Sequence, residues 1–63
     1  MKLLVNGKEH EIPDGETVAS LVPEEKRGIA VAVDGVVVPR SAWSNTELSA
    51  GQRVEILEAR AGG

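Results

Sequence analysis

Residues 29–39 read IAVAVDGVVVP, a pattern typical of two short strands joined by a tight turn. Two apolar arms rich in β-branched residues flank Asp34-Gly35. A two-residue turn of type I′ needs positive φ at both central positions, and an Asp-Gly or Asn-Gly pair supplies them at low cost. Pro39 ends the second arm because it has no N–H to donate to a sheet. The stretch therefore predicts a β-hairpin that ends at Pro39.

A second hairpin is predicted at residues 1–12, MKLLVNGKEHEI, around the turn Asn6-Gly7. Its first arm is apolar. Its second arm is polar and suits an edge strand, where charge discourages pairing with other chains. His10 lies in this polar arm between Glu9 and Glu11. Because adjacent strand residues point to opposite faces, we interpret His10 as a surface residue of the edge strand and not as a metal ligand.

One short helix is expected between the two hairpins. Thr17 is its predicted N-cap. An apolar stripe with the helical spacing i, i+3 and i+4 is formed by Val18, Leu21 and Val22. Pro23 limits this helix, because proline is not tolerated in a helix interior. The helix either stops at Val22, or Pro23 starts a further turn through residues 24–26.

The connection after the second hairpin, RSAWSNTELSAGQ (residues 40–52), has no sustained period and is predicted to be irregular. It holds Trp43, the only aromatic residue, which we expect to close one end of the core. Arg40 has two interpretations: it contacts an acidic partner, or it caps the nearby loop.

A last strand is predicted at residues 53–59, RVEILEA, which gives an element order β-β-α-β-β-β and an α+β domain. One helix covers only one face of a sheet, so the other face is open. Leu4 and Leu57 are expected on the open face, near the small residues Ala30 and Ala32. They form either a partner-binding patch or ordinary surface hydrophobicity.

Composition limits the classes of function. The 63 residues suffice for one small domain, and a net charge of −3 with a single aromatic residue argues against nucleic-acid binding. No apolar run approaches the length of a membrane span, so we expect a cytoplasmic protein. No motif for a nucleophile, a phosphate loop or a metal site is present, so the chain is not expected to be an enzyme.

The chain ends in Gly62-Gly63. We place a folded domain at residues 1–59 and a flexible tail at residues 60–63. A terminal carboxylate reacts only after activation, and glycine lets a backbone thread a narrow channel because it has no Cβ. The pair is therefore either a chemical handle or a disordered end of no consequence.

Three segments together resemble a known family: LLVNGKEHEIPDGETVASL (residues 3–21), VAVDGVVVPRSAW (residues 31–43) and VEILEARAGG (residues 54–63). They are similar to the ThiS family, the ubiquitin-like sulfur carriers of thiamine biosynthesis. The resemblance implies a β-grasp fold, with a mixed sheet of about five strands and one helix packed on one face. It also implies a central parallel pair of the first and last strands, and a flexible Gly-Gly tail.

The resemblance also implies a chemistry. In this family a ThiF-like adenylyltransferase uses ATP to adenylate the terminal carboxylate, here that of Gly63. Sulfur from a cysteine desulfurase then replaces one oxygen, and a ThiG-like thiazole synthase receives it. Gly62 would permit threading, and Ala61 and Arg60 would lie in the partner's channel. The carrier itself binds no cofactor and is a substrate, not a catalyst.

Three other functions remain open from the residues. A related carrier would use the same tail for molybdopterin or another thio-metabolite, and a ubiquitin-like modifier would join Gly63 to lysines of other proteins. A regulatory binding module would use only the sheet face. Two departures from the family pattern lie outside the tail. The helix is short, with Pro23 where continuation is expected, and the turn before the last strand, SAGQRV (residues 49–54), lacks an acidic residue.

Overall fold

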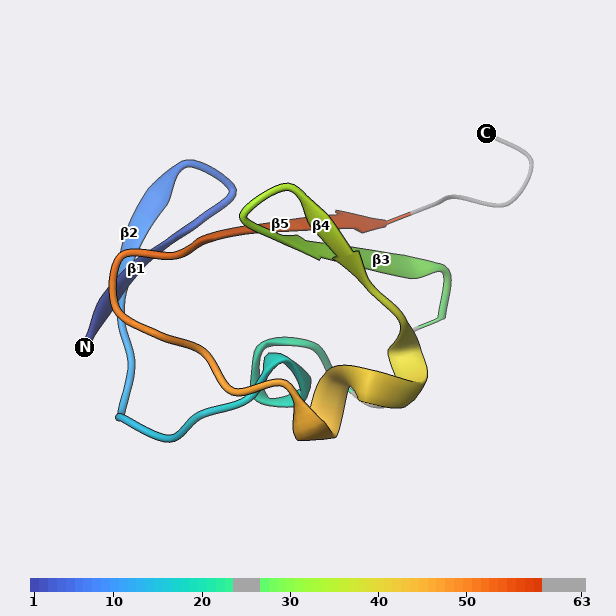
Figure 1. Ribbon diagram of the computed structural model, residues 1–63. Coiled ribbons are helices and arrows are strands. Elements are labelled where there is room, and N and C mark those ends of the chain that lie inside the picture. The colour runs from blue at the N-terminus through green and yellow to red at the C-terminus, as the bar shows by residue number, and fades with distance from the viewer. Residues whose placement is uncertain (24–26, 59–63) are drawn as a thin grey trace.

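The computed structural model describes residues 1–23 and 27–58, which contain one five-stranded mixed sheet (Figure 1). The strands are β1 (Lys2–Val5), β2 (Lys8–Glu11), β3 (Ile29–Val33), β4 (Val36–Val38) and β5 (Arg53–Glu58). Their order across the sheet is β2-β1-β5-β3-β4, and only β1 and β5 run parallel. The β-grasp arrangement and its central parallel pair are therefore confirmed.

Both predicted hairpin turns are present. The φ angles are 51° at Asn6 and 81° at Gly7, and 50° at Asp34 and 83° at Gly35. Positive φ at both central positions is the signature of the type I′ turn, which matches the right-handed twist of the strands it joins. The two dipeptides therefore specify the two hairpins by local geometry alone.

Two 3-10 helices cover one face of the sheet, where one helix was expected (Figure 1). They are η1 (Val18–Leu21) and η2 (Arg40–Asn45). Thr17 occupies the N-cap position of η1, as predicted, and Val22 is its C-cap. The alternative in which the helix continues through residues 24–26 falls outside the described residues. No helix in the described parts of the chain is long and apolar enough to cross a membrane.

The shortness of η1 has a local cause. Val22 is extended, with φ −123° and ψ 126°. A residue before proline is restricted in this way, because the proline ring clashes with a helical conformation at that position. The Ser20 hydroxyl accepts a hydrogen bond from the Thr17 N–H at 3.1 Å and donates one to the Thr17 carbonyl. This side chain thus satisfies the N–H of the N-cap residue, which has no partner within the helix itself.

The expectation of an irregular connection is wrong for residues 40–45, which form η2. Trp43 lies in this helix, is 6% exposed, and donates a hydrogen bond from Nε1 to the Val38 carbonyl at 2.8 Å. Thr46 Oγ1 donates to the Ala42 carbonyl at 2.7 Å and closes the end of the helix. These contacts depend on the packed sheet, so a periodicity search over residues 40–45 does not find the helix.

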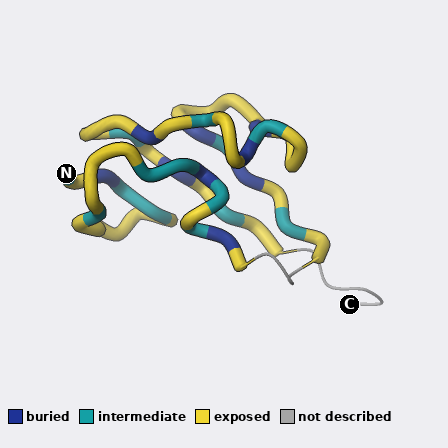
Figure 2. Tube along the Cα trace, turned by 90° about the horizontal axis from the view of Figure 1, so that it is seen from below, coloured by how far each residue is buried: buried dark blue, intermediate teal, exposed yellow. Residues whose placement is uncertain are grey.

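The core lies between the sheet and the two 3-10 helices. More buried and more exposed residues alternate along β3 and most of β5 (Figure 2), as expected when one sheet face is packed and the other is solvated. The edge strand β2 is exposed throughout. The buried residues are Leu3, Val18, Val22, Val31, Val33, Val38, Trp43, Leu48 and Val54. Trp43 belongs to this cluster, in agreement with its predicted place at the core.

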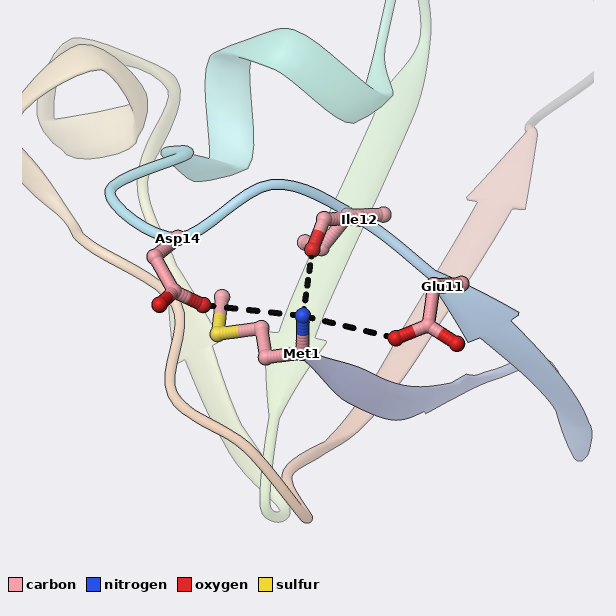
Figure 3. A network of polar contacts seen from close by, with 4 residues as sticks. All are labelled: Met1, Glu11, Ile12 and Asp14. Atoms are coloured by element: carbon pink, nitrogen blue, oxygen red, sulfur yellow. Dashed lines mark hydrogen bonds and ion pairs between the residues drawn. The ribbon is translucent and has the colours of Figure 1, made fainter.

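The N-terminal ammonium group joins the two strands of the first hairpin (Figure 3). It donates to the Ile12 carbonyl at 2.7 Å, and the Ile12 N–H donates back to the Met1 carbonyl at 2.9 Å. Glu11 Oε2 lies at 3.6 Å and Asp14 Oδ1 at 3.5 Å from the same nitrogen. The hydrogen-bond ladder between β1 and β2 is thereby extended by one residue pair, and the ammonium charge faces two carboxylates.

Extension of the chain by Gly-Ser before Met1 should lower the free energy of unfolding by about 0.5–1 kcal/mol. The extension turns the ammonium into a neutral amide, which keeps the bond to Ile12 and loses both charge contacts. The carboxylates are 71% and 89% exposed, so each contact is weak and screened by salt. Urea denaturation at low and high salt measures the loss, which should shrink at high salt.

A matched control is the same extension in a chain that carries Glu11→Gln and Asp14→Asn. With the carboxylates neutral, the extension should cost almost nothing, and the difference between the two backgrounds is the interaction free energy. An equal loss in both backgrounds would show that the ammonium charge has no part in the effect.

Candidate functional site

The four predicted tail residues lie outside the described residues: Arg60, Ala61, Gly62 and Gly63. The described chain ends with Glu58, the last residue of β5. β5 is the central strand of the sheet, with β1 on one side and β3 on the other. The course of β5 therefore determines where the tail starts.

β5 is held on both sides by the two hairpin turns. Asn6 Oδ1 accepts a hydrogen bond from the Ile56 N–H at 2.8 Å, and Asn6 Nδ2 donates to the Ile56 carbonyl at 3.3 Å. On the other side, Asp34 Oδ1 accepts from the Arg53 N–H at 2.9 Å. The Asn6 amide thus replaces a strand residue where β1 has ended. The strand that leads to the tail is fixed by backbone-like bonds along most of its length.

The sheet face opposite the 3-10 helices is open, and the structure places both Leu4 and Leu57 on it. Leu3 is 2% exposed and faces the core, so Leu4 points the other way. Val54 is fully buried, which directs the odd-numbered positions of β5 to the open face. Leu57 is 68% exposed there. The prediction that both leucines share the uncovered face agrees with the sheet register.

Leu57 lies in an apolar neighbourhood near the end of β5. Its direct partner across the strand pair is Ala30, and Ala32 pairs with Val37 on the far side of β3. A hollow of about 110 Å³ is lined by these residues together with Val31 and Glu55. We call Ala30, Ala32, Val37 and Leu57 the Leu57 patch. It is a small, shallow apolar surface near the end of β5, where the described chain ends.

Leu4 lies outside the Leu57 patch. Its partner on β5 is Arg53, four positions before Leu57, which is about 13 Å along a strand. It is half-buried and lines a separate hollow of about 350 Å³ with Asp34, Gly35, Gly51, Arg53 and Glu55. Of the two predicted leucines, only Leu57 therefore lies beside Ala30 and Ala32.

Val37 was missed by the sequence analysis, although it is 70% exposed and contributes to the Leu57 patch. A signal was available in the hairpin itself. A two-residue turn at Asp34-Gly35 pairs Val33 with Val36, so the next pair is Ala32 with Val37. Since Val33 faces the core, Val37 must face the open side together with Ala32.

Two other polar candidates lie away from the Leu57 patch. His10 pairs with Leu3 and is exposed on the edge strand, on the face opposite to Glu9 and Glu11. The Arg40 guanidinium carbon lies 5.2 Å from the centroid of the Trp43 ring, on the side of the sheet that carries the helices. Among the described residues, no group of three or more His, Cys, Asp or Glu side chains could hold a metal ion.

Comparisons with known proteins agree with this geometry. The family model described as the ThiS family matches residues 3–63. The crystal structure of a thiamine biosynthesis protein (ThiS) from Geobacter metallireducens superposes with a TM-score of 0.82 and 29% sequence identity. That match covers 100% of this chain and 100% of the other. No curated protein sequence matches. With the family match extending over almost the whole length, the chain belongs to the ThiS family.

Proposed function

We propose that this protein is a sulfur carrier of thiamine biosynthesis and that Gly63 carries the sulfur as a thiocarboxylate. Membership of the ThiS family supports this proposal most directly, because the matched residues run to position 63 and include Gly62-Gly63. The similar structure from Geobacter metallireducens is described as a thiamine biosynthesis protein and matches end to end. The proposed place of action is the cytoplasm.

The proposed chemistry takes place on the tail and needs no catalytic group in this chain. The Gly63 carboxylate attacks the α-phosphate of ATP in a ThiF-like adenylyltransferase, which releases pyrophosphate and forms an acyl-adenylate. The outer sulfur of a persulfide, formed by a cysteine desulfurase, then attacks the acyl-adenylate and displaces AMP to give an acyl disulfide. A thiol attacks the partner's sulfur of this bond, forms a new disulfide with it, and so releases Gly63 as a thiocarboxylate. Gly62, with Ala61 and Arg60 behind it, would occupy the channel that leads to the ATP. A ThiG-like thiazole synthase is the proposed acceptor.

The Leu57 patch is the proposed docking surface for these enzymes. Residues 59–63 reach at most about 17 Å from the end of β5 when fully extended. An enzyme that receives Gly63 must therefore approach the sheet close to Leu57, whose side chain is 68% exposed on the open face. An exposed apolar patch at this place removes water on contact and holds the carrier while the tail is in the channel.

The test is mass spectrometry of the C-terminal peptide after co-expression with the adenylyltransferase and a cysteine desulfurase. Whole-protein mass is ambiguous, because oxidation of Met1 adds nearly the same mass as exchange of oxygen for sulfur. A glutamate-specific protease cuts after Glu58 and releases residues 59–63 without the methionine. We expect this peptide to carry one sulfur in place of one oxygen.

The control is the same co-expression with an adenylyltransferase that has lost its ATP-binding residues, where the peptide should keep a plain carboxylate. An unmodified peptide from the active enzyme, when that enzyme adenylates another carrier, would contradict the proposal. Recovery of residues 59–63 joined to lysines of other proteins would instead identify a ubiquitin-like modifier.

A further inference from the structure

We infer that the ThiF-like adenylyltransferase covers the Leu57 patch with a surface that carries a basic side chain, lysine or arginine, opposite Glu55. This inference rests on the proposed function, since it describes the partner that docks on the open face. The partner surface must therefore be cationic as well as apolar at the contact.

Glu55 lies in the middle of the open face. It lines both hollows of that face, the one beside Leu57 and the one beside Leu4. Across the strand pair it meets Ala32, whose methyl group can neither pair with the carboxylate nor cover it. A protein surface laid over the Leu57 patch must therefore also lie over Glu55.

Within residues 1–23 and 27–58, Glu55 takes part in no ion pair. The guanidinium of Arg53, two positions away on the same face, forms no ion pair with a carboxylate of these residues either. The Asn6 amide, on the other side of β5, is committed to the backbone of Ile56. The carboxylate is thus solvated by water in the free carrier and is available to a partner.

Docking removes that water. Removing the hydration of a carboxylate without giving it a partner costs several kcal/mol, which offsets most of the free energy that burial of two alanines and two larger aliphatic residues returns. A cation opposite Glu55 removes this cost and adds a charge-assisted contact. The net charge of −3 acts in the same direction, because it attracts a basic surface at long range. The same carboxylate weakens the binding of an apolar partner without a cation.

The experiment measures the dissociation constant of the complex with the purified ThiF-like adenylyltransferase of the same organism, by calorimetry at low and high salt. The variants are Glu55→Lys, Glu55→Gln and Leu57→Asp. Glu47→Lys is the matched control, because Glu47 is exposed beside η1, on the side of the sheet away from the Leu57 patch. Urea denaturation of each variant verifies its fold, and exposed positions should change stability little.

We expect Glu55→Lys to weaken binding about 100-fold or more, because it places like charges in contact. Glu55→Gln should weaken binding about tenfold and flatten its salt dependence, since the charge pair is lost and the shape is kept. Glu47→Lys should bind as the unchanged protein does.

The variants distinguish the docking surface from the cation opposite Glu55. If Glu55→Lys binds normally while Leu57→Asp does not, the cation inference is overturned and the docking surface stands. If both bind normally, the cation inference and the docking surface are both wrong. If Gly63 never receives sulfur and Glu55→Lys still weakens the complex, the sulfur-carrier function fails and the cation opposite Glu55 is supported.

Discussion

Removal of Gly62 and Gly63 is expected to abolish sulfur loading while the fold stays intact. The truncated chain ends at Ala61, so its carboxylate falls about 7 Å short of the position that Gly63 would reach. Adenylation needs the carboxylate at the α-phosphate of ATP, and a displacement of this size leaves no productive geometry. Pyrophosphate exchange with the adenylyltransferase measures the step, and it should fall to the level without carrier.

The same truncated chain should unfold within about 0.5 kcal/mol of the full chain, as exposed terminal changes usually do. Among the described residues, the buried core runs from Leu3 to Val54 and ends before the tail begins. A matched variant, Gly63→Ala, keeps the carboxylate in place and adds one methyl group. It should slow adenylation by about tenfold or more if the channel admits only glycine. Full activity in the truncated chain would remove Gly63 from the mechanism.

Trp43→Ala is expected to bring the domain close to unfolding. Truncation of a buried tryptophan costs about 3–5 kcal/mol through lost burial and the cavity left behind. A chain of 63 residues has a total stability of only about 3–9 kcal/mol. Trp43 is 6% exposed, and its Nε1–H donates to the Val38 carbonyl and so connects η2 to β4. The substitution therefore removes both buried volume and a hydrogen bond. Urea denaturation followed by far-ultraviolet circular dichroism gives the loss.

Trp43→Phe separates the two contributions. Phenylalanine keeps much of the buried apolar surface and loses the Nε1 bond, which leaves the Val38 carbonyl without that donor. We expect a loss of about 1–3 kcal/mol, smaller than for alanine. If the phenylalanine variant were as unstable as the alanine variant, the hydrogen bond and not the packing would account for the effect. No loss in either variant would contradict the assignment of Trp43 to the core.

Local chemistry explains what could be read from the sequence. Asn6-Gly7 and Asp34-Gly35 specify their turns because the conformational demand lies in the two residues themselves. Thr17 and Pro23 mark the two limits of η1 for the same kind of reason. The parallel pairing of β1 with β5 joins the two ends of the chain, and it was expected only from the family resemblance.

Properties that arise between distant segments were decided by the tertiary structure. The second 3-10 helix depends on the hydrogen bond from Trp43 to the Val38 carbonyl of the packed sheet. No periodic pattern in residues 40–45 predicts this helix. The separation of Leu4 from Leu57, and the place of Val37 beside Leu57, follow from strand register across three strand pairs. The exposure of Glu55 without a partner has the same origin, since its neighbour Ala32 is 23 positions earlier in the chain. The sequence alone determined the turns, the alternation of the strands and the glycine tail, because these depend on a few consecutive residues. The docking surface depends on which strands become neighbours, and only the folded sheet decides that.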